Sequence, residues 1–326
     1  MNILVTGATG FTGTALTQRL VKGGHCVRII VRNQNKVEPE LANKLEVIQG
    51  SITDENIVKG ALEGIEAVIH TAAVYREPGL TDNVYWDVHV KATENLLKYS
   101  LKTGVKRFVH VSTGGVHGHI ENPPANEDYR FAPGDIYQRT KLEGEIKARE
   151  FSRNTVLPVV IIRPSPIYGP GDMRLLKLFK LAKMKYTLLP GKGEIFYHMV
   201  YIDDLIDAFI LALEKDSAIG ETFIIGGNET LSLNQLLDLI SDTLNYTKSK
   251  VHLPTLPFKI AGIICEKICI PFKIDPPIYP RRVDFFTKSR SFNIDKAKKI
   301  LGYNPHMSLA EGIRKTADWY IHKKFL

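Results

Sequence analysis

The sequence predicts an α/β protein built on a doubly wound parallel sheet, followed by a smaller C-terminal lobe. Two observations indicate this fold. Six short apolar runs, rich in β-branched residues, are spaced along the first half of the chain, and amphipathic helix patterns lie between them. Runs that are apolar throughout are typical of parallel strands, because helices cover both faces of such a sheet. The 326 residues suffice for one large domain and a smaller lobe.

The elements of the first domain alternate in order along the chain. The expected strands are Ile3–Thr6, Val27–Val31, Leu45–Gln49, Ala67–Thr71, Phe108–Ser112 and Val159–Arg163. The clearest helix patterns are Thr14–Lys22, Thr93–Thr103 and Tyr137–Phe151. A cluster of prolines and glycines follows at 164–171 and indicates a change of architecture. We therefore expect one domain over residues 1–164, to which 197–228 return, and a lobe over 165–196 and 229–326.

Two helix starts are predicted in the lobe. Ser232-Leu233-Asn234-Gln235 and Ser308-Leu309-Ala310-Glu311 both have the spacing of a capping box, and the first should open a helix that reaches about Asn245. The stretch Phe258–Phe272 is strongly apolar but too short to span a bilayer. We interpret it as a helix that covers the substrate pocket, with contact to a membrane surface as the alternative.

Composition excludes several classes of protein. The chain is 44% hydrophobic and 24% charged, as in ordinary globular domains. Three cysteines without CxxC spacing argue against a disulfide framework or a metal site, and no signal peptide is visible, so we expect a cytoplasmic protein. The net charge of +8 is spread along the chain without a nucleic-acid motif, so nucleic acid is not an expected partner.

A glycine-rich turn separates the first strand from the first helix. Its sequence is Thr6-Gly7-Ala8-Thr9-Gly10-Phe11-Thr12-Gly13. Gly7 suits a tight turn, Gly10 allows a pyrophosphate to approach the backbone, and Gly13 allows the helix to pack against the strand. The helix N-terminus then faces the phosphates. This predicts a Rossmann-type dinucleotide site in which Gly7, Gly10, Phe11, Thr12 and Gly13 contact the cofactor.

The residue after the second strand discriminates between the two nicotinamide dinucleotides. An acidic residue there accepts a hydrogen bond from the 2′-hydroxyl of NAD, whereas arginine accommodates the 2′-phosphate of NADP. This chain has Arg32-Asn33, with Lys36 nearby. We therefore expect NADP to be preferred, with NAD as the other possible cofactor.

Tyr137 and Lys141 are four residues apart at the start of a predicted helix, so they share one face. A phenol, whose ordinary pKa is about 10, becomes a usable proton donor and acceptor when a lysine ammonium lowers that pKa. Thr113 follows the fifth strand, at the edge where parallel sheets bind ligands, and its hydroxyl could hold the reacting oxygen of a substrate. Ser112 is the rival for this role.

These residues, taken together, resemble the extended short-chain dehydrogenase/reductase family, also called the NAD-dependent epimerase/dehydratase family, over nearly the whole chain. The family usually has asparagine where this chain has His89, and we expect His89 to be packed rather than catalytic. The motifs that carry the resemblance are Thr6–Gly13, Gly50–Asp54, His70–Ala73, the Thr113 segment, Tyr137 with Lys141, Arg163-Pro164, Tyr168–Asp172, Tyr201–Asp204 and Ala297–Pro305.

The resemblance implies roles for individual residues and a choice of reactions. Thr113, Tyr137 and Lys141 would form a catalytic triad; Ser51, Ile52, Ala72 and Ala73 would line the adenine and ribose, and Pro164 would lie beside the nicotinamide. Gly114 and Gly115 hold no acid, which disfavours sugar dehydration. The chain looks most like the dihydroflavonol reductase and 3-beta-hydroxysteroid dehydrogenase branch. Nucleotide-sugar 4-epimerase and a non-catalytic dinucleotide sensor remain alternatives, and relatives suggest a homodimer.

Overall fold

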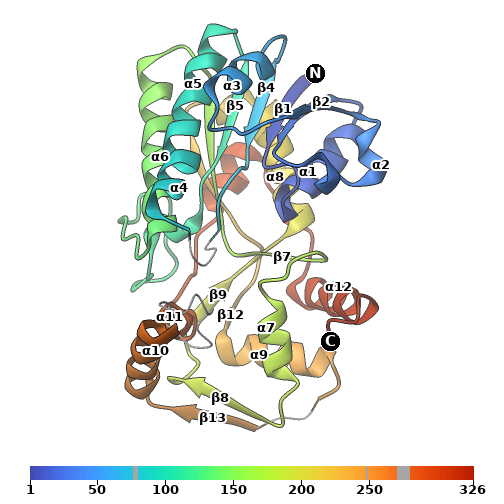
Figure 1. Cartoon of the computed structure of the whole chain (residues 1–326). Helices are drawn as coiled ribbons and strands as arrows, with labels where there is room; N and C mark the ends of the chain where they lie inside the picture. Colours follow the sequence, from blue (N-terminus) through green and yellow to red (C-terminus); the bar gives the residue numbers. More distant parts are fainter. Residues whose placement is uncertain (76–79, 247–248, 270–279) are drawn as a thin grey trace.

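The computed structural model describes residues 1–75, 80–246, 249–269 and 280–326, without the side chains of 280–282. Its centre is a seven-stranded sheet in the order β11-β6-β5-β4-β1-β2-β3, in which every neighbouring pair is parallel (Figure 1). The strands are β1 (Asn2–Thr6), β2 (Cys26–Val31), β3 (Leu45–Gln49), β4 (Ala67–His70), β5 (Arg107–Val111), β6 (Val159–Pro164) and β11 (Thr222–Ile225).

The predicted fold class is confirmed, and the six expected strands agree with the observed ones to within one residue. The seventh strand, β11, was not named as a strand in advance; it pairs with β6 from within 197–228. β2 and β3 follow β1 on one side of it, and the chain then crosses to place β4, β5 and β6 on the other side. Such a switch point opens a crevice at the carboxyl ends of the strands, and that is where a ligand binds in this architecture.

Helices cover both faces of the sheet, and the alternation of side chains along β1 explains why. Ile3 and Val5 point into a core shared with α1 and α8, whereas Leu4 points into a core shared with α3, α5 and α6. Figure 1 shows these two layers on opposite sides of the strands. The helices are α1 (Phe11–Lys22), α2 (Pro39–Ala42), α3 (Glu55–Ala61), α4 (Asp82–Trp86), α5 (Ala92–Lys102), α6 (Ile136–Asn154) and α8 (Ile202–Glu214).

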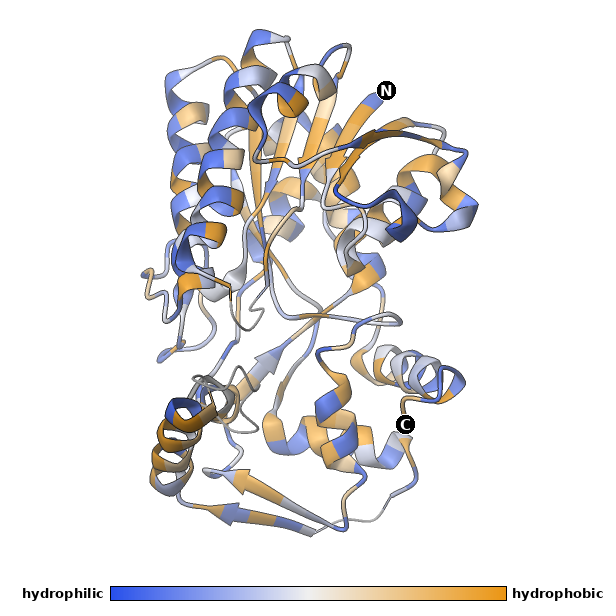
Figure 2. Ribbon diagram, viewed as in Figure 1, coloured by the Kyte–Doolittle hydropathy of each residue, from blue (hydrophilic) through white to orange (hydrophobic). Residues whose placement is uncertain are grey.

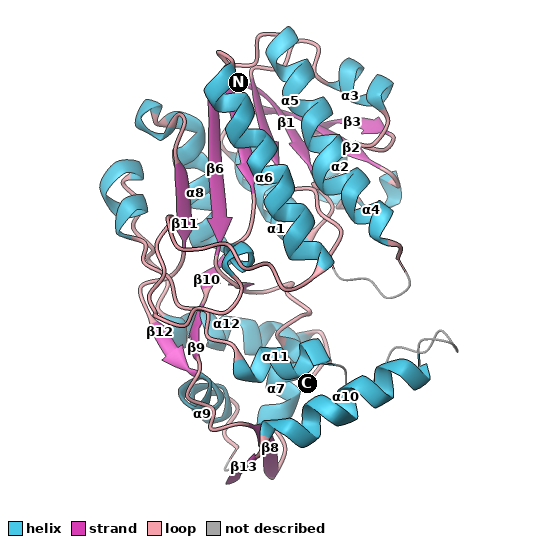
Figure 3. Ribbon diagram, turned by 90° about the vertical axis from the view of Figure 1, so that its left-hand side faces the viewer, coloured by secondary structure: helices cyan, strands magenta, loops and turns pink. Residues whose placement is uncertain are grey.

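A smaller lobe lies below the carboxyl edge of the sheet and contains three two-stranded ladders (Figures 1 and 3). The ladders are β7 (Ile167–Tyr168) with β10 (Val200–Tyr201), β9 (Phe196–His198) with β12 (Thr230–Ser232), and β8 (Tyr186–Pro190) with β13 (Ser249–Leu253). Its helices are α7 (Leu176–Ala182), α9 (Leu233–Thr243), α10 (Thr255–Cys269), α11 (Pro280–Thr287) and α12 (Leu309–His322). None of the helices in the described ranges is long and apolar enough to cross a membrane.

The two predicted capping boxes have different outcomes. At α9 the prediction is confirmed, because the Ser232 hydroxyl accepts from the Gln235 N–H and the Gln235 side chain accepts from the Ser232 N–H. At α12 only the first half forms, from the Glu311 N–H to Ser308. The Glu311 carboxylate instead pairs with Lys315 one turn later, at 3.0 Å. A lysine at i+4 competes with the backbone for that carboxylate, and the prediction from the capping-box spacing did not take this lysine into account.

Candidate active site

A cleft of about 760 Å³ lies at the carboxyl ends of the strands and is lined by residues of both the sheet and the lobe. Its volume is in the range of small-molecule and cofactor sites. All the residues predicted for the site line this one cleft. They are Gly7, Gly10, Phe11, Thr12, Gly13, Arg32, Ser51, Ile52, Ala72, Ala73, Thr113, Tyr137, Lys141 and Pro164.

The glycine turn at the end of β1 is too tight for side chains. Gly7 has a φ of +77°, in the left-handed region, and an added Cβ would lie 2.7 Å from the Ala72 backbone. A Cβ on Gly13 would lie 2.0 Å from the Gly7 carbonyl oxygen. Gly10 is the N-cap of α1 and has no side chain to cap it. The turn therefore presents the uncapped N-terminus of α1 to the cleft, as an anion-binding turn requires.

Lys141 reaches the cleft from the buried face of α6. Its side chain is 3% exposed, and its Nζ donates to the Val111 carbonyl oxygen at 2.5 Å, at the end of β5. Burial lowers the pKa of Lys141 to about 8, although the nearby Glu145 carboxylate opposes the shift. Tyr137 lies one turn earlier on the same helix and is half-buried, with its ring edge-on to Tyr75 at 5.1 Å between centroids.

His89 connects the loop after β4 to α6, beside Tyr137. Its Nε2 accepts from the Val74 N–H at 2.9 Å, so its Nδ1 carries the proton and donates to the Thr140 hydroxyl at 2.8 Å. Its ring also packs edge-on against the Tyr137 ring, with centroids 5.5 Å apart. Burial, and then the charge of Lys141, lower the pKa of His89 to about 2, which keeps the ring neutral. His89 is thus packed behind the phenol rather than exposed to the cleft.

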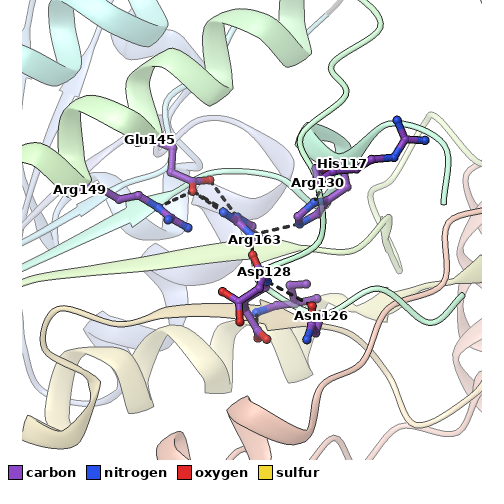
Figure 4. Close-up of polar contacts among 9 residues, drawn as sticks. His117, Asn126, Asp128, Arg130, Glu145, Arg149 and Arg163 are labelled. Carbon is purple, nitrogen blue, oxygen red and sulfur yellow. Dashed lines mark hydrogen bonds and ion pairs between the residues drawn. The ribbon is translucent and has the colours of Figure 1, made fainter. Parts of the chain in front are cut away.

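A buried ion pair supports α6 one turn beyond Lys141. Arg163 of β6 donates to both oxygens of Glu145 at 2.7–3.2 Å, and neither side chain is exposed (Figure 4). Arg163 also contacts His117 Nε2 at 3.0 Å and the Glu127 carbonyl oxygen at 2.8 Å. Burial tends to raise the pKa of Glu145, but its hydrogen bonds to Arg163 and the guanidinium charge outweigh burial and lower it. The pair fixes α6 to the sheet.

Thr113 and Ser112 both line the cleft at the end of β5. The Thr113 hydroxyl accepts from the Gly115 N–H at 3.1 Å and caps a 3₁₀ turn, Gly114–His117. Ser112 is 4% exposed. The capping bond fixes the Thr113 side chain in place and leaves its hydroxyl hydrogen available to a ligand oxygen.

The lobe contributes an apolar and aromatic wall that the sequence did not identify in detail. This wall includes Tyr197, Met199, Phe285 and Phe292. The guanidinium carbon of Arg290 lies 5.9 Å from the centre of the Tyr197 ring. The expectation that Phe258–Phe272 covers the pocket is wrong for its described part, because no residue of α10 lines the cleft. Residues 270–272 lie outside the described residues. Phe285 of α11 takes that place, since α11 lies between α10 and the sheet side of the lobe.

The comparisons with known proteins agree with this geometry. The family model described as the NAD dependent epimerase/dehydratase family matches residues 3–226. The chain belongs to this family. The match covers the whole central sheet, the glycine turn and α6, so the enzyme is of the NAD-dependent dehydrogenase or epimerase type.

Relatives of this epimerase/dehydratase family member act on different molecules. It is 30% identical to the sterol-4-alpha-carboxylate 3-dehydrogenase (decarboxylating) of Candida albicans, over 98% of this chain and 97% of the relative. It superposes on UDP-glucose 4-epimerase of Thermotoga maritima, solved with UDP-glucose, with a TM-score of 0.79 and 25% identity over 99% and 100% of the two chains. It also superposes on UDP-glucuronic acid 4-epimerase of Bacillus cereus, solved with UDP-glucuronic acid and NAD. The TM-score is 0.78 and the identity is 26%, over 99% of this chain and 100% of that chain.

Sequence reasoning missed the supporting residues of this family member. Glu145 follows Lys141 by four residues, so the same helix face that revealed the Tyr137/Lys141 pair also marked a buried carboxylate. Arg174 and Arg290, which line the cleft, had no such signal, because they come from lobe segments without a motif. Among the described residues, no group of three potential ligands could hold a metal ion.

Proposed function

We propose that the chain is an NAD(P)-dependent oxidoreductase that interconverts a secondary alcohol and a ketone, with Thr113, Tyr137 and Lys141 as its catalytic residues. One observation carries the proposal: these three side chains and the glycine turn line the same cleft. A tyrosine beside a buried lysine whose pKa is lowered, next to a dinucleotide turn, is an arrangement that suits hydride-transfer chemistry.

The residues of the turn fit a dinucleotide, because Gly7 and Gly13 have no room for a Cβ and the N-terminus of α1 is open to a phosphate. Gly10, Phe11, Thr12 and Gly13 would hold the pyrophosphate, Ser51, Ile52, Ala72 and Ala73 the adenosine half, and Pro164 would lie by the nicotinamide. When bound, the cofactor accepts or donates the hydride.

The chain itself supplies the proton and the orientation. The Thr113 hydroxyl holds the reacting oxygen, and Tyr137 removes its proton in oxidation or donates a proton in reduction. The Lys141 ammonium stabilises the phenolate, because the low polarity of its buried site strengthens the attraction between the two charges.

We expect Lys141→Met to lose activity and gain stability. Without the ammonium the Tyr137 phenolate loses the positive charge that stabilises it, so kcat should fall about a hundredfold or more. In the native protein the pKa of Lys141 is lowered from 10.5 to about 8. Charging this buried amine therefore opposes folding at neutral pH, and the unfolding free energy should increase with pH between about 8 and 10.5. Lys141→Met removes this cost and should add about 1–2 kcal/mol in urea unfolding at pH 7.

The matched control for that variant is Lys147→Met, on the same helix but half-exposed in ion pairs with Glu94 and Glu150. It should change kcat less than about twofold and stability by less than about 1 kcal/mol. A Lys141→Met protein that is less stable than the parent, or as active, would contradict the role assigned to the buried ammonium.

His89→Ala should lower kcat about ten- to a hundredfold with little effect on dinucleotide affinity, because His89 holds the Tyr137 ring and the Val74 backbone in register. His89→Asn introduces the residue that the family usually has there and should recover most of the loss. Steady-state kinetics with circular dichroism, to confirm folding, measures both. Equal kcat in all three proteins would show that His89 has no positioning role.

We propose that NADP is preferred over NAD. Arg32 and Lys36 line the cleft beyond β2, and the lining there contains no carboxylate. A guanidinium–phosphate contact contributes about 1.5–3 kcal/mol, so Arg32→Ala should reduce the ratio of kcat/KM for NADP over NAD about tenfold or more. Asn33→Ala is the control. An NAD preference that survives Arg32→Ala unchanged would contradict the proposal.

Nucleotide-sugar 4-epimerisation is the second candidate, favoured by Arg290 and Arg174 in the cleft, which could pair with a diphosphate. The two functions differ in their optical signal. A dehydrogenase presented with a 3β-hydroxysteroid or a dihydroflavonol changes the absorbance at 340 nm, whereas an epimerase converts UDP-glucose without a net change. We expect the first result; epimerisation alone would favour the second candidate, and no reaction with either class would favour the non-catalytic sensor.

We also propose a cytoplasmic homodimer. The support is that α5 and α6 lie side by side on the outer surface of the domain, where they could pack against the same pair in a second copy (Figure 1). Light scattering after size-exclusion chromatography measures the mass directly.

A further inference from the structure

Helix α10 turns its most apolar side toward solvent. Five large aliphatic side chains on it are 45–65% exposed, whereas the opposite side carries Gly262, which is buried, and Phe258, Cys265, Glu266 and Cys269, which are half-buried. A helix packed on a core has the opposite arrangement. The exposed aliphatic residues are Leu256, Ile260, Ile263, Ile264 and Ile268.

The β8–β13 ladder extends this surface. Tyr186 and Leu188 of β8 are 58% and 52% exposed, and Val251 of β13, which is paired with Leu188, is 36% exposed. β13 ends at Leu253, two residues before α10 begins. Figures 1 and 2 place the helix and the ladder together at the end of the lobe farthest from the sheet, with many hydrophobic residues in both. We call these eight residues of α10, β8 and β13 the apolar tip.

Basic residues surround the apolar tip. Residues 175–193, which lead into and out of β8, contain five lysines and no acidic residue. On α10 itself, Lys259 and Lys267 are exposed and Glu266 is half-buried. An exposed aliphatic stripe flanked by lysines is the pattern of a helix that lies in the interface of an anionic membrane. The same charges would repel each other if two copies joined through this face.

We propose that the apolar tip docks on anionic lipid membranes. The aliphatic side chains of α10 enter the boundary between headgroups and acyl chains, and the lysines pair with lipid phosphates. α11 packs against α10 and carries Phe285 to the cleft wall, so docking brings the substrate end of the cleft close to the lipid. This placement favours an apolar, membrane-dissolved alcohol or ketone as the substrate, a point that rests on the proposed function; the docking itself does not.

The test is co-sedimentation of the full chain with two kinds of vesicle. One is made of phosphatidylcholine alone, and the other also contains about 30 mol % phosphatidylglycerol. We expect binding to the anionic vesicles only. Ile260→Ser/Ile264→Ser and Lys259→Glu/Lys267→Glu should each lower the partition coefficient about tenfold or more. Val156→Ser, at an 89% exposed aliphatic residue outside the tip, is the matched control and should bind like the parent.

Each other outcome overturns the proposal. No binding of the parent, or equal binding by the isoleucine variant, removes the lipid role of α10. A change of oligomeric mass in that variant, seen by light scattering without a change in sedimentation, identifies the tip as a contact between copies. Dinucleotide affinity, measured on the same proteins, should be unchanged. A normal dinucleotide affinity with failed docking would leave the proposed function standing.

Discussion

Tyr137→Phe is expected to lower kcat by about two to four orders of magnitude, the usual contribution of a positioned general acid–base. The substitution removes only the hydroxyl, and the ring contacts with His89 and Tyr75 remain, so the cleft should keep its shape. The dinucleotide dissociation constant, measured by fluorescence quenching, should stay within about threefold, because the glycine turn is untouched. The pattern of lost kcat with retained affinity is that of a group acting in the transition state.

Tyr75→Phe is the matched control, since Tyr75 lies edge-on to Tyr137 and also lines the cleft. It should change kcat less than about threefold. If both variants lost activity equally, the aromatic pair would be packing the cleft and neither phenol would carry the proton. Turnover of Tyr137→Phe at the parent rate would refute its assignment as the proton donor.

Glu145→Gln is expected to destabilise the protein by about 3–5 kcal/mol, because it leaves the Arg163 guanidinium charged in a site where neither partner is exposed. The loss should appear in urea unfolding at pH 7. Since the native pKa of Glu145 is lowered, the contribution of the carboxylate is present above its unfolded-state pKa and disappears as the pH falls through the native one. The difference between parent and variant should therefore shrink in acid.

Two further variants separate the effect of the buried charge from the effect of any substitution on this helix. Glu150→Gln, on an exposed part of the same helix, should change stability by less than about 0.5 kcal/mol. The double variant Glu145→Leu/Arg163→Met replaces the buried pair by apolar groups and should recover most of the loss. A Glu145→Gln protein as stable as the parent would mean that water, rather than Arg163, compensates the carboxylate.

The local order of strands and helices was predictable because the parallel strands are mostly apolar and the apolar residues of helices repeat every 3.6 residues. The edge strand β11 was not predicted because Thr222–Ile225 is only four residues long. Its place beside β6 also depends on a pairing between segments about sixty residues apart in the chain. The glycine turn and the Tyr137/Lys141 pair were visible because each lies within a few consecutive residues. The helix predicted after Ser308 begins where it was expected, but the second bond of its capping box does not form, because Glu311 pairs with Lys315 instead.

The surroundings of the site were less accessible to sequence reasoning because they are assembled from distant segments. His89 meets Thr140 and Val74 only after folding, and the lobe wall joins Tyr197 to Phe285 and Phe292 across about ninety residues. The orientation of α10 could not be read from its composition either. Its isoleucines are consistent with a buried helix, and the burial of Gly262, with the partial burial of Phe258, Cys265 and Cys269, shows which side faces the protein.

The most direct test of the account is a crystal structure of the chain with bound NADP. We predict that the pyrophosphate lies on the turn formed by Gly10 to Gly13, with the nicotinamide C4 within about 4 Å of the space next to the Tyr137 hydroxyl. A dinucleotide bound elsewhere, or a Tyr137 hydroxyl that faces bulk solvent while the turn is occupied, would contradict it.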